Sequence, residues 1–192
     1  LEWKPTRYQP LGRMMRDRKL LTEIMCTAIE QGVTRAPAKG DVLAFLPGVA
    51  EIRHVIRLLE ERGNLKDDIH ILPLYGALPK DQQDSVIFPT PDAPRRVIVS
   101  SPIAEASLSL ERVTCVVDSG LRREPRCDVD TGMPRLVTSR CSKASATQRA
   151  GRAGRVQEGL CVRVYNEAEF RDQFLEHAQP EIASTDLCPT LL

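Results

Sequence analysis

Cationic side chains that could bind phosphate are concentrated in one short stretch of the sequence. Residues 148–155 read QRAGRAGR, in which Arg149, Arg152 and Arg155 recur at a spacing of three and Ala or Gly fills every gap. A guanidinium donates two parallel hydrogen bonds to phosphate and neutralises charge in phosphoryl transfer. Side chains three apart share one face of a helix, where like charges repel. The stretch therefore favours an anion-binding site over a solvated basic helix end, and it predicts a ridge of arginines if the helix reaches Arg155.

The basic character of this stretch extends over residues 121–163 but not over the whole chain. The 192 residues include 27 Lys and Arg and 26 Asp and Glu, so the formal net charge is +1 at pH 7. This balance excludes a global polycation that would attract nucleic acid through its overall field. A polyanion would have to bind to the local surface that residues 121–163 form.

The composition gives little support to a metal site, a disulfide framework or a membrane span. Six cysteines are scattered without a C-x-x-C pair, and the three histidines lie far from them in the sequence. This spacing argues against zinc and favours reduced intracellular thiols. No apolar run of about 18 residues occurs, and no charged-then-apolar segment opens the chain. We expect a soluble intracellular protein with no metal ligands and no membrane partner.

Helical and extended patterns alternate along the chain. Apolar residues recur at helical spacing in 17–30 and 49–62, and Pro79 and Pro89 bracket a third helix at 80–88. A fourth helix is expected at 142–153. Short apolar runs typical of buried strands occupy residues 42–47, 69–75, 95–101, 114–120 and 160–165.

This alternation predicts an α/β fold in which a mostly parallel sheet carries helices on both faces. Residues 121–142 contain the turn-forming run DVDTGMP between extended flanks, which indicates a protruding β-hairpin. Parallel sheets of this kind bind ligands at the carboxyl ends of their strands. We therefore expect the loops after the strands to surround the arginines of residues 148–155.

Four segments resemble motifs of the superfamily-2 helicases in their DEAH-box form, and they occur in the family's order. QRAGRAGR matches motif VI, Q-R-x-G-R-x-G-R, and SSPIAEASLSLERVTCVVDSG resembles motif V. DVLAFLPGVAEI resembles motif IV, and LPLYGALPKDQQ resembles motif IVa. The wording of YGAL and ASATQRAGRAGR is most similar to the HrpB-like branch. The resemblance covers residues 41–170 and implies the second RecA-like domain of a two-lobed motor.

The same resemblance implies a division of the chain. Residues 17–176 would form the RecA-like helicase C-terminal domain, after an irregular lead-in at 1–16. Residues 177–192 would begin a linker toward a winged-helix domain. The sequence contains no P-loop and no DExH. We therefore expect ATP with Mg²⁺ as the cofactor, the metal being held by a first lobe outside this chain, and no ATP hydrolysis by the chain alone.

Family resemblance assigns roles around the phosphates of ATP. Arg152 and Arg155 match the arginine fingers, and Gln148 matches the residue that contacts the γ-phosphate or the attacking water. Arg149 is either a third finger or an internal salt-bridge partner, of which the second is favoured. Such fingers supply about 10³ to 10⁵ in rate in related phosphoryl-transfer systems.

Other matching positions concern the adenosine. Phe88 would stack on the adenine ring, as a flat apolar side chain can, unless it is a core residue. Ser107 would sense the nucleotide, and Ser109 and Glu111 would approach the ribose.

Nucleic acid would contact the domain mainly through its phosphates. Gly76 and Ser101 match family positions that hold the strand, and Arg122 and Arg126 lie on the predicted hairpin, which matches an element beside the nucleic-acid path. A plain surface hairpin is the alternative.

Two functions remain open at this stage. The favoured one is the second motor lobe of an ATP-dependent RNA helicase, whose partners are single-stranded RNA and the first RecA-like lobe; phosphate-binding residues do not distinguish RNA from DNA. The alternative is a catalytically degenerate lobe that binds RNA or a partner without turnover. Pro102 and Ala106 support the alternative, because they replace the family's Asn and Thr and remove a backbone N–H and a hydroxyl. The intact QRAGRAGR favours the motor.

Overall fold

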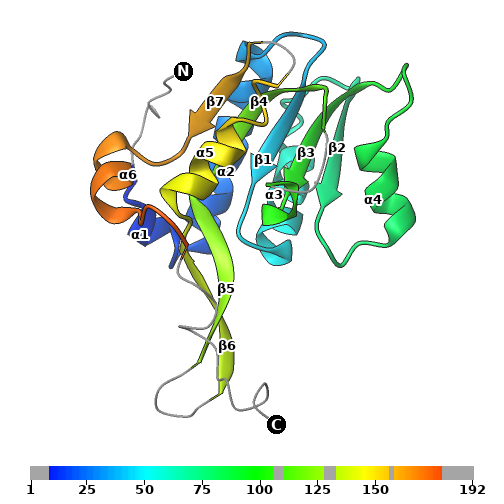
Figure 1. Ribbon diagram of the computed structural model, residues 1–192. Helices are drawn as coiled ribbons and strands as arrows, with labels where there is room; N and C mark the ends of the chain where they lie inside the picture. The colour runs from blue at the N-terminus through cyan, green and yellow to red at the C-terminus, as the bar shows by residue number, and fades with distance from the viewer. Residues whose placement is uncertain (1–8, 106–109, 128–132, 156–157, 179–192) are drawn as a thin grey trace.

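The predicted parallel sheet is the centre of the structure. The computed structural model describes residues 9–105, 110–127, 133–155 and 158–178. Its main sheet has five strands in the order β2-β3-β1-β4-β7, and every neighbouring pair is parallel (Figure 1). The strands are β1 (Asp41–Phe45), β2 (Ile69–Leu74), β3 (Arg95–Ser100), β4 (Val113–Asp118) and β7 (Leu160–Arg163). The α/β prediction is confirmed.

Helices pack on both faces of this sheet. The helices are α1 (Leu11–Met14), α2 (Arg18–Arg35), α3 (Val49–Arg62), α4 (Lys80–Ile87), the 3₁₀ turn η1 (Pro102–Ala104), α5 (Lys143–Ala150) and α6 (Glu167–Gln173). One face buries Val42 and Ala44 of β1 in a large core with α2 and α3. The other face buries Leu43 and Phe45 in a smaller core that includes Val86 of α4. Burial on both faces explains why the strands are continuous apolar runs.

The second helix is longer than predicted. Asp17 caps α2 by accepting a hydrogen bond from the Leu20 N–H at 3.0 Å, as an N-cap carboxylate does. The helical pattern predicted a helix over 17–30, which Gln31 and Gly32 follow, but α2 continues to Arg35. A Cβ at position 32 would lie 3.0 Å from Cys115 Sγ of β4. The glycine therefore permits close helix–sheet packing, and it is not a stop signal.

Part of the predicted irregular lead-in belongs to the folded domain. Leu11 and Met14 of α1 are almost fully buried in the larger core. The Leu11 N–H donates to Glu169 Oε1 of α6 at 2.9 Å. This buried hydrogen bond joins the first helix of the structure to the last one. The prediction of an irregular segment at 1–16 is wrong for residues 11–14, because a four-residue helix carries too little periodicity to be recognised in a sequence.

The predicted hairpin is confirmed and projects away from the sheet (Figure 1). Its strands, β5 (Leu121–Cys127) and β6 (Pro134–Arg140), pair antiparallel with Leu121 opposite Arg140. Gly120 turns the chain out of β4 with a φ of 70°, a conformation that favours glycine. A Cβ there would also lie 2.6 Å from a ring carbon of Tyr165. The root of the hairpin is therefore tightly packed against the body.

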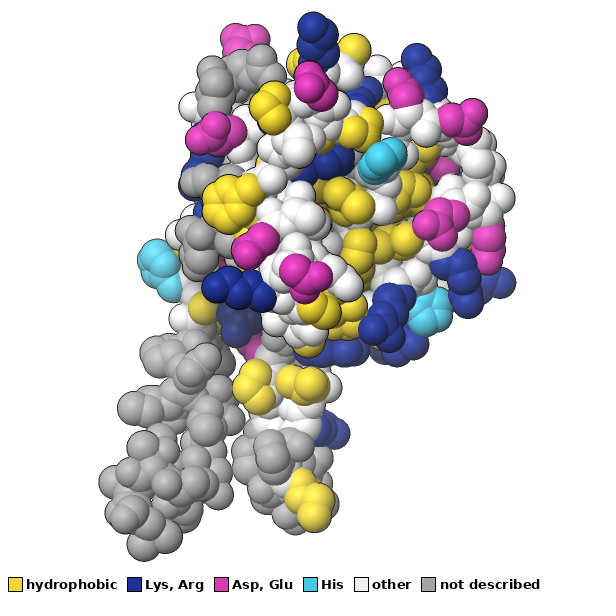
Figure 2. All heavy atoms as spheres, turned by 90° about the vertical axis from the view of Figure 1, so that its right-hand side faces the viewer, with side chains coloured by type: hydrophobic (Ala, Val, Ile, Leu, Met, Phe, Trp, Pro, Cys, Tyr) yellow, Lys and Arg dark blue, Asp and Glu magenta, His cyan; other side chains and the backbone are white. Residues whose placement is uncertain are grey.

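The strand β2 forms one edge of the main sheet, opposite to β7 and beside α4. Figure 2 shows apolar side chains gathered on this face among charged ones, and Ile69, Ile71 and Pro73 of β2 are half-buried. The Leu74 carbonyl bonds to the Ser101 N–H, on the side of β3. Since neighbours alternate in a strand, Pro73 faces the free edge, where its missing N–H hinders pairing with another strand.

Four of the cysteines are buried thiols. Cys26, Cys115, Cys141 and Cys161 are free, and burial raises the pKa of each thiol to about 12. Across the residues that the structure describes, no three His, Cys, Asp or Glu side chains cluster as metal ligands would. Within the same residues, every helix is too short or too polar to cross a membrane.

Candidate nucleotide and nucleic-acid site

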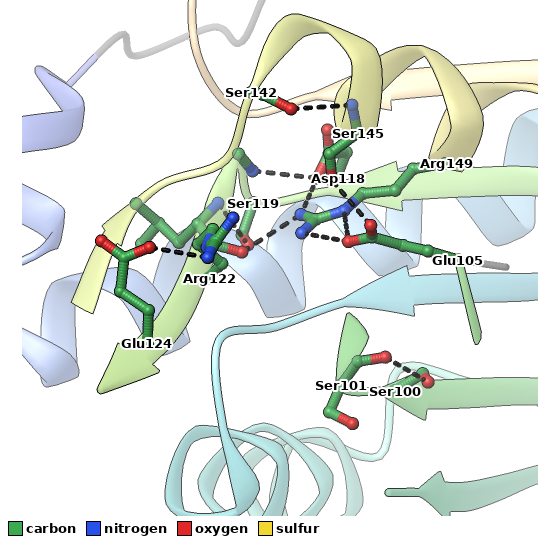
Figure 3. A network of polar contacts seen from close by, with 12 residues as sticks. Ser100, Ser101, Glu105, Asp118, Ser119, Arg122, Glu124, Ser142, Ser145 and Arg149 are labelled. Atoms are coloured by element: carbon green, nitrogen blue, oxygen red, sulfur yellow. Dashed lines mark hydrogen bonds and ion pairs between the residues drawn. The ribbon is translucent and has the colours of Figure 1, made fainter. Parts of the chain in front are cut away.

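The carboxyl ends of β3 and β4 and the helix α5 bring the predicted motifs together. Ser101 follows β3, Asp118 ends β4, and Arg149 reaches between Glu105 and Asp118 from α5 (Figure 3). Ser142 caps α5 by accepting a hydrogen bond from the Ser145 N–H at 3.1 Å. This cap fixes where the helix begins.

Arg149 is the buried centre of a polar network. Its Nε donates to Glu105 Oε1 at 2.7 Å, and its Nη1 donates to Asp118 Oδ1 at 2.8 Å and to the Leu121 carbonyl at 3.1 Å. The guanidinium also lies over the Phe45 ring, 5.1 Å from its centroid. Arg149 and Asp118 are both 0% exposed. Arg149 is therefore an internal salt-bridge partner, the favoured one of the two interpretations.

Electrostatics keep this buried guanidinium charged. Burial alone would lower the pKa of Arg149, but the charges of Asp118 and Glu105 outweigh it and raise the pKa above its ordinary value. Asp118 is further satisfied by the Tyr165 hydroxyl at 2.8 Å and the Gly120 N–H at 2.9 Å. A buried ion pair with its remaining lone pairs satisfied is the arrangement that the low-dielectric interior tolerates.

Glu105 and Asp118 are functional candidates that sequence reasoning did not single out. Both stood inside the quoted motif V segment, but nothing in their spacing indicated that they would pair with Arg149. Ser145 Oγ also donates to Glu105 Oε2 at 2.7 Å. Glu105 of motif V therefore forms hydrogen bonds with two side chains of α5, the helix in which motif VI begins.

The three arginines do not form a ridge. The helix ends at Ala150, and the chain continues as a turn in which the Arg152 N–H bonds to the Arg149 carbonyl at 3.0 Å. Arg149 points into the core, Arg152 is 5% exposed with its Nη2 donating to the Glu105 carbonyl, and Arg155 is exposed. The ridge was conditional on a helix as far as Arg155, and this condition is not met, because the helix predicted to about residue 153 ends at Ala150.

The predicted phosphate-contacting residues differ in their surroundings. Burial and the neighbouring charge of Arg155 lower the pKa of Arg152. Gln148 and Arg155 both lie at the surface, on either side of this buried arginine. Two of the three predicted side chains are therefore exposed, and the third, Arg152, donates to the Glu105 carbonyl of the motif V segment.

The adenosine residues are placed only in part. Phe88 follows α4 directly and is 73% exposed, so the alternative that it is a core residue is wrong. Glu111 is also exposed. Ser107 and Ser109 lie outside the described residues, as does Ala106.

The two predicted strand-contacting positions lie side by side after β2 and β3. Gly76 is exposed, and the Ser101 N–H donates to the Leu74 carbonyl at 3.0 Å. That N–H is therefore already used within the fold. Pro102 occupies the first position of η1, where an N–H would have no acceptor within the helix. Its missing donor costs the fold nothing at this position, but an N–H without an acceptor in the helix is the kind that can donate to a phosphate, so the argument from Pro102 for a degenerate lobe is unchanged.

Glu124 forms ion pairs with both hairpin arginines. Arg122 lies 2.7 Å from one of its carboxylate oxygens and Arg126 lies 2.9 Å from the other. Burial opposes ionisation, but the hydrogen bond from Arg126 and the charge of Arg122 lower the pKa of Glu124. Because two guanidinium groups share one carboxylate, the three side chains together retain a net positive charge.

Comparison with known proteins decides the family. Residues 20–157 match the family described as helicase conserved C-terminal domain. The chain belongs to this family. That span includes the strands β1 to β4, the hairpin and the arginine stretch 148–155. The helicase C-terminal domain therefore contains the whole Arg149 network except Tyr165.

Individual relatives of this helicase C-terminal domain agree. The chain is 41% identical over 153 residues to the ATP-dependent RNA helicase HrpB of Escherichia coli strain K12, and 39% identical over 160 residues to the ATP-dependent RNA helicase HrpA of Borreliella burgdorferi. These alignments cover 80% and 83% of the chain, but 18% and 19% of the relatives. The chain therefore spans about a fifth of their length.

Solved structures support the same conclusion. The crystal structure of the E. coli DExH-box NTPase HrpB superposes with a TM-score of 0.81 and 36% identity, over 96% of this chain and 22% of that one. The resemblance to DEAH-box helicases, and to the HrpB-like branch, is confirmed.

Proposed function

We propose that this domain is the second motor lobe of an ATP-dependent RNA helicase. The observation that carries the proposal is the buried Arg149 clamp, which fixes α5 against the ends of β3 and β4 and so presents the turn 151–155 at the ligand-binding edge of the sheet. Relatives named ATP-dependent RNA helicases at about 40% identity support it. Single-stranded RNA and the first RecA-like lobe are the proposed partners.

ATP would lie between this domain and the first lobe, which would supply the Mg²⁺ site. On this side, the exposed ring of Phe88 fits a base-stacking role and the exposed Arg155 fits a phosphate contact. Arg152 would join Arg155 at the phosphates by leaving the Glu105 carbonyl. The chemistry supplied by these guanidinium groups is neutralisation of charge that develops on the transferred phosphoryl group.

The proposed RNA path crosses Gly76, Ser101 and the hairpin. The Ser101 hydroxyl and the surface at Gly76 would contact phosphates, and Arg122 and Arg126 would add positive charge along the hairpin. Contacts of this type bind the backbone without reading sequence.

Hydrolysis of ATP by the full-length protein, with and without single-stranded RNA at fixed salt, tests the proposal. Turnover that rises on addition of RNA supports a motor, and a parallel measurement with single-stranded DNA identifies the preferred strand. If the full-length protein binds RNA but does not hydrolyse ATP, this domain would instead be a catalytically degenerate helicase lobe that binds RNA.

Replacing Phe88 by alanine should raise the KM for ATP of the full-length protein about 5- to 150-fold, because a base–aromatic stack contributes roughly 1–3 kcal/mol. The side chain is 73% exposed, so the melting temperature should change little. Phe88→Tyr keeps a flat ring and should stay near the wild-type KM. An unchanged KM in Phe88→Ala would remove Phe88 from the nucleotide site.

A further inference from the structure

Glu105 connects the segment after β3 to the arginine turn. Its carboxylate accepts Arg149 Nε at 2.7 Å through one oxygen and Ser145 Oγ at 2.7 Å through the other. Its backbone carbonyl accepts Arg152 Nη2. One residue therefore binds the first turn of α5, its last turn and the segment that follows the helix.

The path from Glu105 back to Ser101 is short and ordered. Pro102, Ile103 and Ala104 form η1, in which the Ala104 N–H bonds to the Ser101 carbonyl at 3.4 Å and the Glu105 N–H bonds to the Pro102 carbonyl at 2.9 Å. Ala104 is fully buried in the smaller core. The proline ring fixes one backbone dihedral of this turn. A displacement of Ser101 would thus carry Glu105 with it.

The other side of the network is anchored to the sheet by several contacts. Arg149 is 0% exposed and is held from β4 by Asp118, whereas the Glu105 side chain keeps 16% exposure at the outer side of the network. Arg149 also stacks over Phe45 of β1. Movement of the 101–105 segment would therefore be transmitted mainly to Ser145 and Arg152, because Arg149 has independent anchors in the sheet.

We propose that Glu105 is a positioning residue that aligns the arginine turn 151–155 with the strand-contacting segment at Ser101, so that RNA bound at Ser101 sets where Arg152 lies relative to ATP. This inference rests on the proposed motor function and deepens it. Glu105 touches neither ATP nor RNA in this scheme; its side chain acts through Arg149 and Ser145, which hold α5 and so the start of the turn from which Arg152 would reach the phosphates. Misplacement of a reacting group by about 1 Å can cost on the order of 10²-fold in rate.

The test uses full-length protein carrying Glu105→Ala, Glu105→Gln or Ser145→Ala, with Glu158→Ala as the matched control. Glu158 is an exposed acid close in sequence to the same turn, and it is not one of the residues that form the network among the described part of the chain. For each variant, RNA-stimulated kcat, the KM for ATP, the RNA dissociation constant and the melting temperature are measured. Glutamine keeps an acceptor for Arg149 and a polar group for Ser145, so it serves as the conservative rescue.

Glu105→Ala should lower the RNA-stimulated kcat about 10- to 100-fold, with the KM for ATP and the affinity for RNA near wild type. Glu105→Gln should recover most of that kcat, and Glu158→Ala should match wild type. If Glu105→Ala does not fold, Ser145→Ala decides the matter, since loss of one hydrogen bond to Glu105 should lower kcat about 3- to 10-fold.

The outcomes separate this inference from the proposed function. Wild-type kcat in Glu105→Ala, or in Ser145→Ala where the first variant is unfolded, overturns the positioning role and leaves the motor standing. A loss that appears only as weaker RNA binding or a lower melting temperature also overturns it. A wild-type protein without RNA-stimulated turnover overturns both.

Discussion

Replacing Arg152 and Arg155 together by alanine in the full-length protein should reduce RNA-stimulated ATP hydrolysis by about 10³-fold or more, with RNA affinity largely retained. The two guanidinium groups would neutralise charge that exists only in the transition state, so the loss should appear in kcat more than in KM. Steady-state turnover at saturating RNA and fixed salt, beside a filter-binding or anisotropy measurement of RNA affinity, tests this expectation.

Arg171→Ala is the matched control for the double variant. Arg171 is an exposed arginine on α6 that pairs only with its neighbour Asp172 at 2.7 Å among the described residues, and its loss should leave turnover unchanged. The single variant Arg155→Ala isolates the exposed guanidinium from the packed Arg152. Turnover near wild type in the double variant would show that neither arginine acts on ATP.

Arg149→Ala should destabilise the domain by about 3–5 kcal/mol, because removing one partner of a buried ion pair leaves the other charge without compensation. Asp118 would remain at 0% exposure with only the Tyr165 hydroxyl and the Gly120 N–H, and Glu105 would lose its strongest partner. The free energy of unfolding, from urea titration of the chain followed by circular dichroism, measures the effect.

The pH dependence of this loss follows from the raised pKa of Arg149. A group whose pKa is higher in the folded than in the unfolded state contributes stability that is fully present below the unfolded value. The difference between wild type and Arg149→Ala should therefore be equal at about pH 6 and about pH 8, because both lie far below the unfolded pKa of an arginine and the guanidinium is fully charged at each. Arg171→Ala again serves as control, with an expected change within about 0.5 kcal/mol. A loss for Arg149→Ala no larger than that would contradict the clamp.

Local sequence signals determined most of the secondary structure. The helix predicted at 49–62 has those bounds, because Gly63 adopts the left-handed conformation that ends a helix. Each predicted strand was found, since a strand buried on both faces needs an apolar run that shows in the sequence itself. The hairpin was predictable because its turn residues lie between its two strands. The exceptions are α2, whose Gly32 serves packing on β4, the short helices α1 and α6, which were not predicted, and α5, which ends at Ala150 before the predicted residue 153.

The family could also be recognised from the sequence, because its motifs are contiguous and their order is unchanged. The directions in which the arginine side chains point could not be predicted from the sequence. Arg149 points inward because Glu105 and Asp118, 44 and 31 residues away, meet it in space. Arg152 and Arg155 diverge because α5 stops at Ala150. Helix and strand preferences arise among neighbours within a few residues, whereas the pairing of a buried charge depends on carboxylates that only the folded sheet brings within hydrogen-bond distance. The sequence by itself therefore determined which elements form and which family they belong to, and the tertiary structure decided which arginine holds the site together and which ones can face a ligand.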